Sequence, residues 1–408
     1  MAIVRSTLLR FSLLLVFLLV SLEANSEQAG VTYLNTIREK SGLIALKSNK
    51  ALQNAAASHA HYLIQHQRNG HYQTQGNYGY TGNTPSERVV KAGYPSTFVM
   101  ENVSINTVDQ KKSIDNLFSA IYHRFVFLDF DIDEIGSGVS STKKKRKIKH
   151  AYVYNMGASG LAELCGRSFT LTPGVYYMTE VCKESTKMVP QSLFEETKDK
   201  VRRKNREIIV YPYAEQTDIW PAFYNESPDP LPGYKVSGFP LSVQFNPAYY
   251  TDVKLKSFRL YDEKGKEIKE SRILHYNSDP NHRLNKLEFV LMPLRRLEFN
   301  TRYSAVFEAV ADGTKVKKQW RFRTAKPEEK IYRVSGNRTT LAVKAGSTAL
   351  LYMVPSSRND ILYSYRSKGG ITASFLDQNT LKVTFPKRRS SGRVSLDFGK
   401  KKVFFDVE

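Results

Sequence analysis

The sequence predicts an α+β chain in which a helix-rich N-terminal part is followed by modules made of β-strands. Apolar residues recur at helical spacing within residues 30–68 and again within 114–125. From residue 241 the pattern changes, because Leu241, Val243 and Phe245 alternate with polar residues, as expected for a strand with one buried face. Prolines separate the two parts and exclude one continuous element there, at Pro212, Pro221, Pro228, Pro230, Pro232 and Pro240.

The first 26 residues predict a secretory signal peptide. Arg5 and Arg10 form a positive n-region, and Phe11–Leu22 is an apolar segment too short for a comfortable membrane span. Ala24 and Ser26 place small residues where a signal peptidase reads the chain. We therefore expect a secreted or periplasmic protein with no transmembrane segment after signal cleavage, and an uncleaved anchor is the alternative.

The chain has two cysteines, Cys165 and Cys182. In an oxidising compartment such a pair predicts a disulfide. Two metal-binding thiols are the alternative, but this pair lacks the short C-x-x-C spacing that zinc sites use.

The formal net charge is +22, with basic runs at 143–147, 202–204, 387–389 and 400–402. A charge run is usually a solvated loop or strand edge. The functional interpretation is attraction to an anionic envelope surface, such as phospholipid head groups or acidic polysaccharide. We do not expect a nucleic-acid partner, because no nucleic-acid-binding motif accompanies the charge.

The helix-rich part has a regular series of predicted elements. They are, in order, a helix from about Val31 to Ser41, a helix from an N-cap at Ser48 through Leu63, a polar loop over 69–84, a short helix over 85–91, a helix carrying His123, and strands over 134–140 and 150–156 joined by a basic hairpin loop. The helix carrying His123 is predicted as one element from an apolar stripe at Ile114, Leu117, Phe118, Ile121 and Phe125. His123 itself lies off that stripe.

The remainder is predicted as three segments. Residues 161–232 are an extension containing both cysteines, a charged helix within 191–206 and the proline-rich linker. Residues 233–326 are an Ig-like β-sandwich, in which Tyr303 lies where such sandwiches have a tyrosine corner. Residues 327–408 carry short strand-like runs such as LKVTF and KKVFFDV and form a small β module.

Seven stretches between residues 30 and 160 occur in a characteristic order. They are A-x-x-H-A-x-x-L at 56–63, Gly70-His71, PSERVVKAGYP at 85–95, MENVS at 100–104, the segment with His123-Arg124, EIGSGV at 134–139, and AYVYNMGASG at 151–160. Together they resemble the CAP superfamily, also called SCP/PR-1, in its bacterial form. The resemblance implies an α-β-α sandwich with a cleft over residues 27–160.

In that family two histidines and two glutamates line the cleft and can hold a divalent cation. His71, Glu101 and His123 match three of these positions, and Ala120 stands at the fourth. Two imidazoles can bind Zn²⁺ or another divalent cation, with Glu101 orienting one ring or acting as a general base. In the alternative without a site, His71 is a loop residue, Glu101 a cap and His123 a solvated helix end.

Further histidines and replaced family residues limit the interpretation. His59 is expected to be a buried, hydrogen-bonded structural residue and His61 an exposed one, while His150 flanks the basic loop. Met100, Leu117 and Tyr122 replace the family's glycine, tryptophan and glycine, which indicates a divergent cleft.

Three functions are compatible with the sequence. The leading one is a secreted CAP-domain protein that binds a lipid or glycan, or serves as an interaction module of the cell envelope, rather than an enzyme. One alternative is a metal-dependent hydrolase acting on peptide or envelope polymer through His71, Glu101 and His123. The other is a structural or adhesive protein with a vestigial CAP cleft, in which the β modules and positive charge carry the function.

Overall fold

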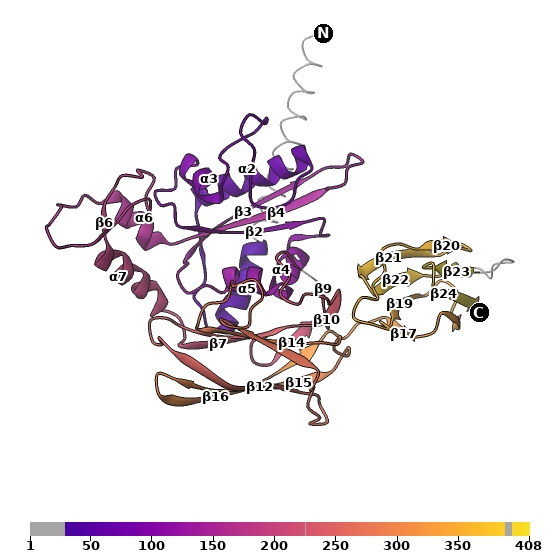
Figure 1. Cartoon of the computed structure of the whole chain (residues 1–408). Helices are drawn as coiled ribbons and strands as arrows, with labels where there is room; N and C mark the ends of the chain where they lie inside the picture. Colours follow the sequence, from indigo (N-terminus) through magenta and orange to yellow (C-terminus); the bar gives the residue numbers. More distant parts are fainter. Residues whose placement is uncertain (1–28, 225, 388–393) are drawn as a thin grey trace, which may run out of the picture. The chain divides into compact units, whose positions relative to one another are not determined.

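The computed structural model describes residues 29–224, 226–387 and 394–408 (Figure 1). The predicted signal peptide at 1–26 lies outside these residues. The chain divides into two compact units. Of the described residues, those up to Tyr213 together with Val243–Asp252 form unit 1, and those within Ala214–Ser242 and Val253–Glu408 form unit 2.

Unit 1 is built on a four-stranded sheet. Its strand order is β1-β3-β4-β2, with β1 at Lys47–Ser48, β3 at Glu134–Ser141, β4 at His150–Gly157 and β2 at Val99–Ile105. β1 pairs parallel with β3, and the other neighbours pair antiparallel. The predicted strands at 134–140 and 150–156 are thus confirmed as β3 and β4.

Helices cover both faces of this sheet (Figure 1). α2 (Lys50–His66) and α3 (Pro85–Lys91) lie on one side, and α4 (Gln110–Ser119) and α5 (Ile121–Phe127) lie on the other. A further helix spans residues 29–41 and ends at Gly42, as predicted. The predicted α-β-α sandwich is therefore confirmed.

Two glycines of the EIGSGV stretch allow α2 to lie directly on β3. A Cβ atom at Gly136 would lie 2.0 Å from the backbone nitrogen of Gln53, and one at Gly138 would lie 2.2 Å from that of Ala57. Any side chain here would push the helix off the sheet. α2 begins one residue later than predicted, because the side chain of Asn49, rather than Ser48, accepts hydrogen bonds from the first turn.

The segment carrying His123 differs from the prediction. The expected single helix is interrupted at Ala120, whose backbone is extended (φ −83°, ψ 112°), giving α4 and α5. The carbonyl of Phe118 at the end of α4 accepts a hydrogen bond from Arg124 Nε at 2.7 Å, which stabilises the break. The apolar stripe is nevertheless buried at all five positions, because both short helices face the same core.

The extension after the sheet contains α6 (Ser159–Gly166), β5 (Tyr177–Met178), β6 (Val189–Pro190) and α7 (Gln191–Arg202). The Cys165–Cys182 disulfide is confirmed. α7 confirms the charged helix but ends at Arg202, four residues before the predicted limit. It is followed by β7 (Ile208–Tyr211).

Unit 2 contains the predicted sandwich. One sheet has the order β12-β15-β16-β8, with β12 at Val253–Tyr261, β15 at Arg302–Ala311, β16 at Thr314–Thr324 and β8 at Gln216–Ile219. β13 (Ser271–His275) and β14 (Glu288–Pro293) pair antiparallel, as do β9 (Ala222–Tyr224) and β10 (Val236–Gly238). β11 (Leu241–Phe245) spans the division between the units. The sandwich starts earlier than the expected boundary at 233, because β8 lies within the predicted linker and pairs with β16.

The predicted tyrosine corner is present. Tyr303 is buried at the start of β15, and its hydroxyl oxygen accepts a hydrogen bond from the backbone nitrogen of Glu298 at 3.0 Å. This bond ties the strand to the turn that precedes it.

The C-terminal β module is confirmed as a second, smaller sandwich. One sheet has the order β17-β19-β22-β21, at Lys330–Val334, Thr348–Met353, Thr380–Thr384 and Thr372–Asp377. The other has the order β18-β24-β23-β20, at Arg338–Val343, Lys402–Val407, Val394–Asp397 and Arg366–Lys368. Its core includes Leu351, Leu381 and Phe405. Within the described part of the chain, no helix has both the length and the apolarity needed to cross a membrane.

Candidate functional site

The candidate site of unit 1 is centred on the carboxylate of Glu101 in β2. Its side chain is 1% exposed. Oε2 accepts a hydrogen bond from Arg88 Nη2 at 2.6 Å, and Oε1 lies 3.0 Å from His71 Nδ1. His71 and Glu101 are in contact, and the closest partner of the carboxylate is Arg88, which the sequence analysis did not single out.

Arg88 reaches Glu101 from the first turns of α3. Thr84 caps this helix by accepting from the backbone nitrogen of Glu87, and Pro85 begins it. The Arg88 side chain is fully buried, and its Nη1 donates to the carbonyl oxygens of His71 and Asn83 at 2.9 and 3.1 Å. One guanidinium therefore fixes both the carboxylate and the polar loop of residues 69–84.

His59 of α2 completes the buried network. Its Nε2 lies 3.0 Å from the carbonyl oxygen of Gly70, and its Nδ1 lies 3.1 Å from Gln73 Nε2. These contacts fit a neutral ring in which Nε2–H donates and Nδ1 accepts. Burial lowers the pKa of His59 to about 4, although the nearby Glu101 carboxylate acts in the opposite direction. The prediction of a buried, hydrogen-bonded His59 is confirmed, and His61 is exposed as expected.

Glu101 remains ionised despite its burial. Burial alone would raise its pKa, but the hydrogen bond with His71 and the charge of Arg88 together hold the pKa below its usual value. Asn155 of β4, with its amide oriented to satisfy both neighbours, donates to Oε2 at 3.0 Å and accepts from the backbone nitrogen of Ala56. The carboxylate is thus bound on several sides by donors.

The structure places His123 on α5, whose backbone is tied to the strand of Glu101. The carbonyl oxygen of His123 accepts a hydrogen bond from Asn102 Nδ2 at 2.9 Å. Ala120, at the fourth family position, is the buried N-cap residue of α5 and offers no carboxylate.

The donors do not fit a bound divalent cation as they are arranged. Both oxygens of Glu101 are engaged by Arg88 and His71. In residues 29–224, 226–387 and 394–408, no group of three or more His, Cys, Asp or Glu side chains could hold a metal ion. The metal role of His71, Glu101 and His123, and the general-base role of Glu101, stay predictions, and we derive no step through a metal.

Three members of the network were missed by sequence reasoning: Arg88, Gln73 and Asn155. For Arg88 a signal existed, since it lies beside Val89 on the face of α3 that must be buried, and a buried arginine requires an acidic partner. The contacts of Gln73 and Asn155 depend on the folded conformation of the loop and on the strand register. No local sequence pattern predicts either.

Unit 1 has helices on both faces of a β1-β3-β4-β2 sheet and a buried network that contains His59, His71 and Glu101. These features define a CAP domain, and Ig-like β modules follow it. Residues 31–156 match the sequence model of the CAP family, described as the cysteine-rich secretory protein family. The N-terminal part of this chain is therefore a CAP domain, and the resemblance given by the seven stretches is confirmed.

Several solved structures are similar to parts of the chain. An outer surface protein from Borrelia burgdorferi is 17% identical with a TM-score of 0.29, over 33% of this chain and 92% of that one. An extracellular protein containing an SCP domain from Bacillus anthracis is 16% identical with a TM-score of 0.28, over 33% and 41%. The titin Ig tandem domains A164-A165 are 12% identical with a TM-score of 0.17, over 49% and 97%. At such TM-scores these likenesses support no statement about function. A search of curated proteins found no match.

Proposed function

We propose that this chain is an extracytoplasmic binding protein that attaches to an anionic component of a cell envelope and performs no catalysis. The single observation that carries the proposal is the buried ion pair between Arg88 and Glu101. The network engages both oxygens of Glu101, the residue predicted as a general base, so we assign the strongly basic chain a binding role.

The chemistry of the pair supports a structural role for Glu101. A general base needs a pKa near the working pH and a free lone pair directed at the substrate. Glu101 has a pKa held below its usual value, and both of its oxygens are engaged. Proton transfer to this carboxylate is thus disfavoured by charge and by geometry.

The charge and the disulfide support the location and the class of partner. The Cys165–Cys182 disulfide is the kind of bond that persists in oxidising compartments. A formal net charge of +22 favours association with anionic surfaces and polymers over neutral ones.

Binding of the full chain to immobilised ligands tests the proposal. The probes are polygalacturonate, dextran sulfate and phosphatidylglycerol vesicles, with neutral dextran and phosphatidylcholine vesicles as controls. We expect saturable retention by at least one anionic probe that weakens as salt is added, because salt screens exposed charges. Equal retention on anionic and neutral probes, or none on either, would overturn the proposal.

A metal-dependent hydrolase is the second candidate, and it is favoured only by the contact between His71 and Glu101. Zinc titration of the full chain by calorimetry tests it, with the His71→Ala/His123→Ala double variant alongside. Stoichiometric uptake that the double variant loses would restore this candidate. Absence of uptake in both proteins would remove it.

A further inference from the structure

The outer face of the β12-β15-β16 sheet in unit 2 carries an ordered grid of side chains. Antiparallel pairing places five rows across the three strands, and residues directly opposite one another share a face. The rows are Lys254–Val310–Lys315, Ser257–Glu308–Lys317, Arg259–Val306–Gln319, Tyr261–Ser304–Arg321 and the pair Arg302–Arg323.

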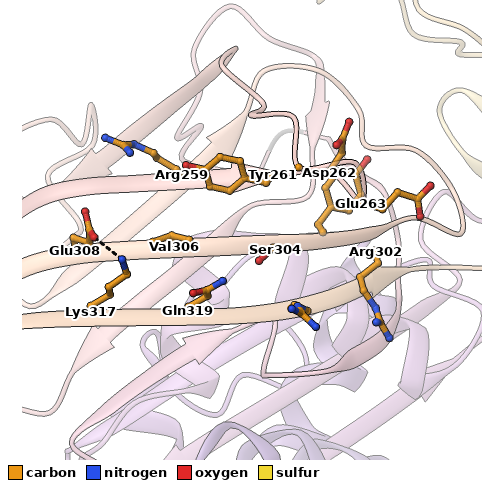
Figure 2. A pocket seen from close by; sticks show the side chains of 13 residues that line it. Arg259, Tyr261, Asp262, Glu263, Arg302, Ser304, Val306, Glu308, Lys317 and Gln319 are labelled. Carbon is orange, nitrogen blue, oxygen red and sulfur yellow. Dashed lines mark ion pairs between the residues drawn. The ribbon is translucent and has the colours of Figure 1, made fainter.

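This grid forms a trough along the central strand. Ser304 and Val306 of β15 are small and form its floor, while Arg259 and Tyr261 of β12 stand on one side (Figure 2). Longer side chains of β16, including Lys317 and Gln319, stand on the other (Figure 2). The cavity volume is about 560 Å³, which lies within the usual range for ligand sites.

The face is strongly cationic. Its outward positions include seven basic residues, which are Lys254, Arg259, Arg302, Lys315, Lys317, Arg321 and Arg323. On the described strand rows the one carboxylate is Glu308, which pairs with Lys317 at 3.0 Å and accepts from Ser257 Oγ at 3.0 Å. Asp262 and Glu263 also line one end of the trough, and Arg302 pairs with Glu215 at 3.9 Å, but along the rows themselves the basic residues outnumber the acidic one.

Two arginines stand at the end of the face nearest the start of β15. Arg302 and Arg323 lie directly opposite each other, and Arg302 lies 3.9 Å from a carboxylate oxygen of Glu215 while Arg323 donates to the carbonyl oxygen of Asn300 at 3.0 Å. β15 lies between β12 and β16 and carries the floor residues Ser304 and Val306. An extended ligand lying along β15 has cations on both sides. Such a lengthwise distribution of charge complements a linear polyanion.

We propose that this trough, the outer face of β12, β15 and β16, binds an extended acidic polysaccharide, with Arg259 and Arg321 contacting its carboxylate or sulfate groups. The inference rests on the proposed function and assigns it to one surface. Guanidinium groups suit this role, because their planar fork donates two parallel hydrogen bonds to a carboxylate or sulfate. Tyr261, whose side chain is hydrogen-bonded to Arg259, offers a ring face to a sugar unit.

The shape of the surface favours a polysaccharide over a lipid bilayer. Basic surfaces that bind a bilayer also insert apolar side chains into it, whereas Val306 is part of a recessed floor flanked by longer residues.

One end of the trough lies at the turn at 262–265, where Asp262 accepts from the backbone nitrogens of Lys264 and Lys266. Glu263 also lines this end, so a polyanion would run away from it along β15.

The test compares the full chain with a trough variant, Arg259→Gln/Arg321→Gln. The matched control is Lys144→Gln/Lys145→Gln, which removes the same charge from exposed residues of the hairpin loop in unit 1. The Kd for polygalacturonate and for dextran sulfate is measured by calorimetry at about 0.15 M salt. Thermal unfolding of each variant establishes that the fold is retained.

We expect the trough variant to bind at least about tenfold more weakly while the control stays within about twofold of the parent. An equal loss in both variants would overturn the trough and leave a diffuse charge effect. Parental binding to phosphatidylglycerol vesicles but to neither glycan would overturn the polysaccharide as occupant. A parent that binds no anionic probe would overturn the proposed function as well, which separates that failure from failure of the trough alone.

Discussion

Arg88 and Glu101 form an ion pair inside the CAP domain, with Nη2 of the arginine 2.6 Å from Oε2 of the glutamate and neither side chain exposed by more than 1%. The pair joins α3 to β2, and through the carbonyl oxygens of His71 and Asn83 it also holds the loop at 69–84. This ion pair positions His71 and Glu101. Its arginine, Arg88, was not among the residues of the predicted metal site.

Replacing Arg88 with methionine should strongly destabilise unit 1. Glu101 would keep its charge without its main partner, and breaking a buried pair from one side costs about 3–5 kcal/mol. The described helices all lie in unit 1, and both tryptophans, Trp220 and Trp320, lie in unit 2. Urea unfolding followed by helical circular dichroism should therefore shift to lower urea.

Two further variants make the Arg88 experiment specific. Lys91→Met on the exposed side of the same helix should change the midpoint little. Arg88→Met/Glu101→Gln should recover part of the loss, because it removes the unpaired charge. If the double variant is no more stable than Arg88→Met, the pair is not the source of the effect.

Unit 1 should lose stability as the pH falls from 6.5 to 4, in part because of His59. The unfolded imidazole takes up its proton near its ordinary pKa of 6.5, whereas burial lowers the pKa of His59 to about 4 in the folded chain. Between these values the unfolded state binds more protons than the folded state. The free energy of unfolding therefore falls as the pH is lowered. The whole interval corresponds to about 3 kcal/mol.

The His59→Gln variant isolates this contribution. Glutamine can both donate to the Gly70 carbonyl and accept from Gln73, but it does not titrate. Unfolding free energies measured by helical circular dichroism between pH 4 and 6.5 should thus fall less steeply than in the parent. His61→Gln, at an exposed position of the same helix, should keep the parental slope. An unchanged slope in His59→Gln would contradict the assignment.

Much of the fold could be predicted from the sequence because its signals are local. Apolar periodicity located α2 and the buried stripe of α4 and α5, and alternation located β11. The break at Ala120 could not be predicted, since it depends on the contact of Arg124 with the Phe118 carbonyl in the folded chain. β8 was missed because its partner β16 lies about a hundred residues away in the sequence.

The candidate site was only partly predictable. The family resemblance placed His71 and Glu101 together, and their contact is present. It gave no role to Arg88, which neutralises the carboxylate and so changes the chemistry that Glu101 can perform. The trough in unit 2 depends on which residues lie opposite one another across three strands. Local sequence patterns do not predict that register.

The Tyr303→Phe variant should destabilise unit 2 by about 1–3 kcal/mol. The Tyr303 hydroxyl accepts a hydrogen bond from the Glu298 backbone nitrogen, and its loss leaves that part-buried donor without this partner. Tryptophan fluorescence during urea unfolding should report the shift, because both tryptophans lie in unit 2. Tyr276→Phe removes a hydroxyl from an exposed ring and is the matched control. Equal midpoints for the two variants would show that the corner adds no stability.

Removing the disulfide should destabilise the extension that follows β4. Cys165 and Cys182 are 17 residues apart, and a loop of that size contributes about 3 kcal/mol when its closure restricts the unfolded chain. Cys165 and Cys182 also lie in an apolar cluster with Leu161, Val189 and Phe194, so serine at both positions adds a smaller packing cost.

Chemical reduction of the parent separates the two effects, because it opens the loop but keeps both sulfur atoms in the cluster. We expect reduced parent and Cys165→Ser/Cys182→Ser to unfold at lower urea than the oxidised parent by helical circular dichroism, with the double variant lowest. If reduction leaves the transition unchanged while the serine variant shifts, the stabilisation comes from packing of the sulfur atoms and loop closure contributes nothing measurable.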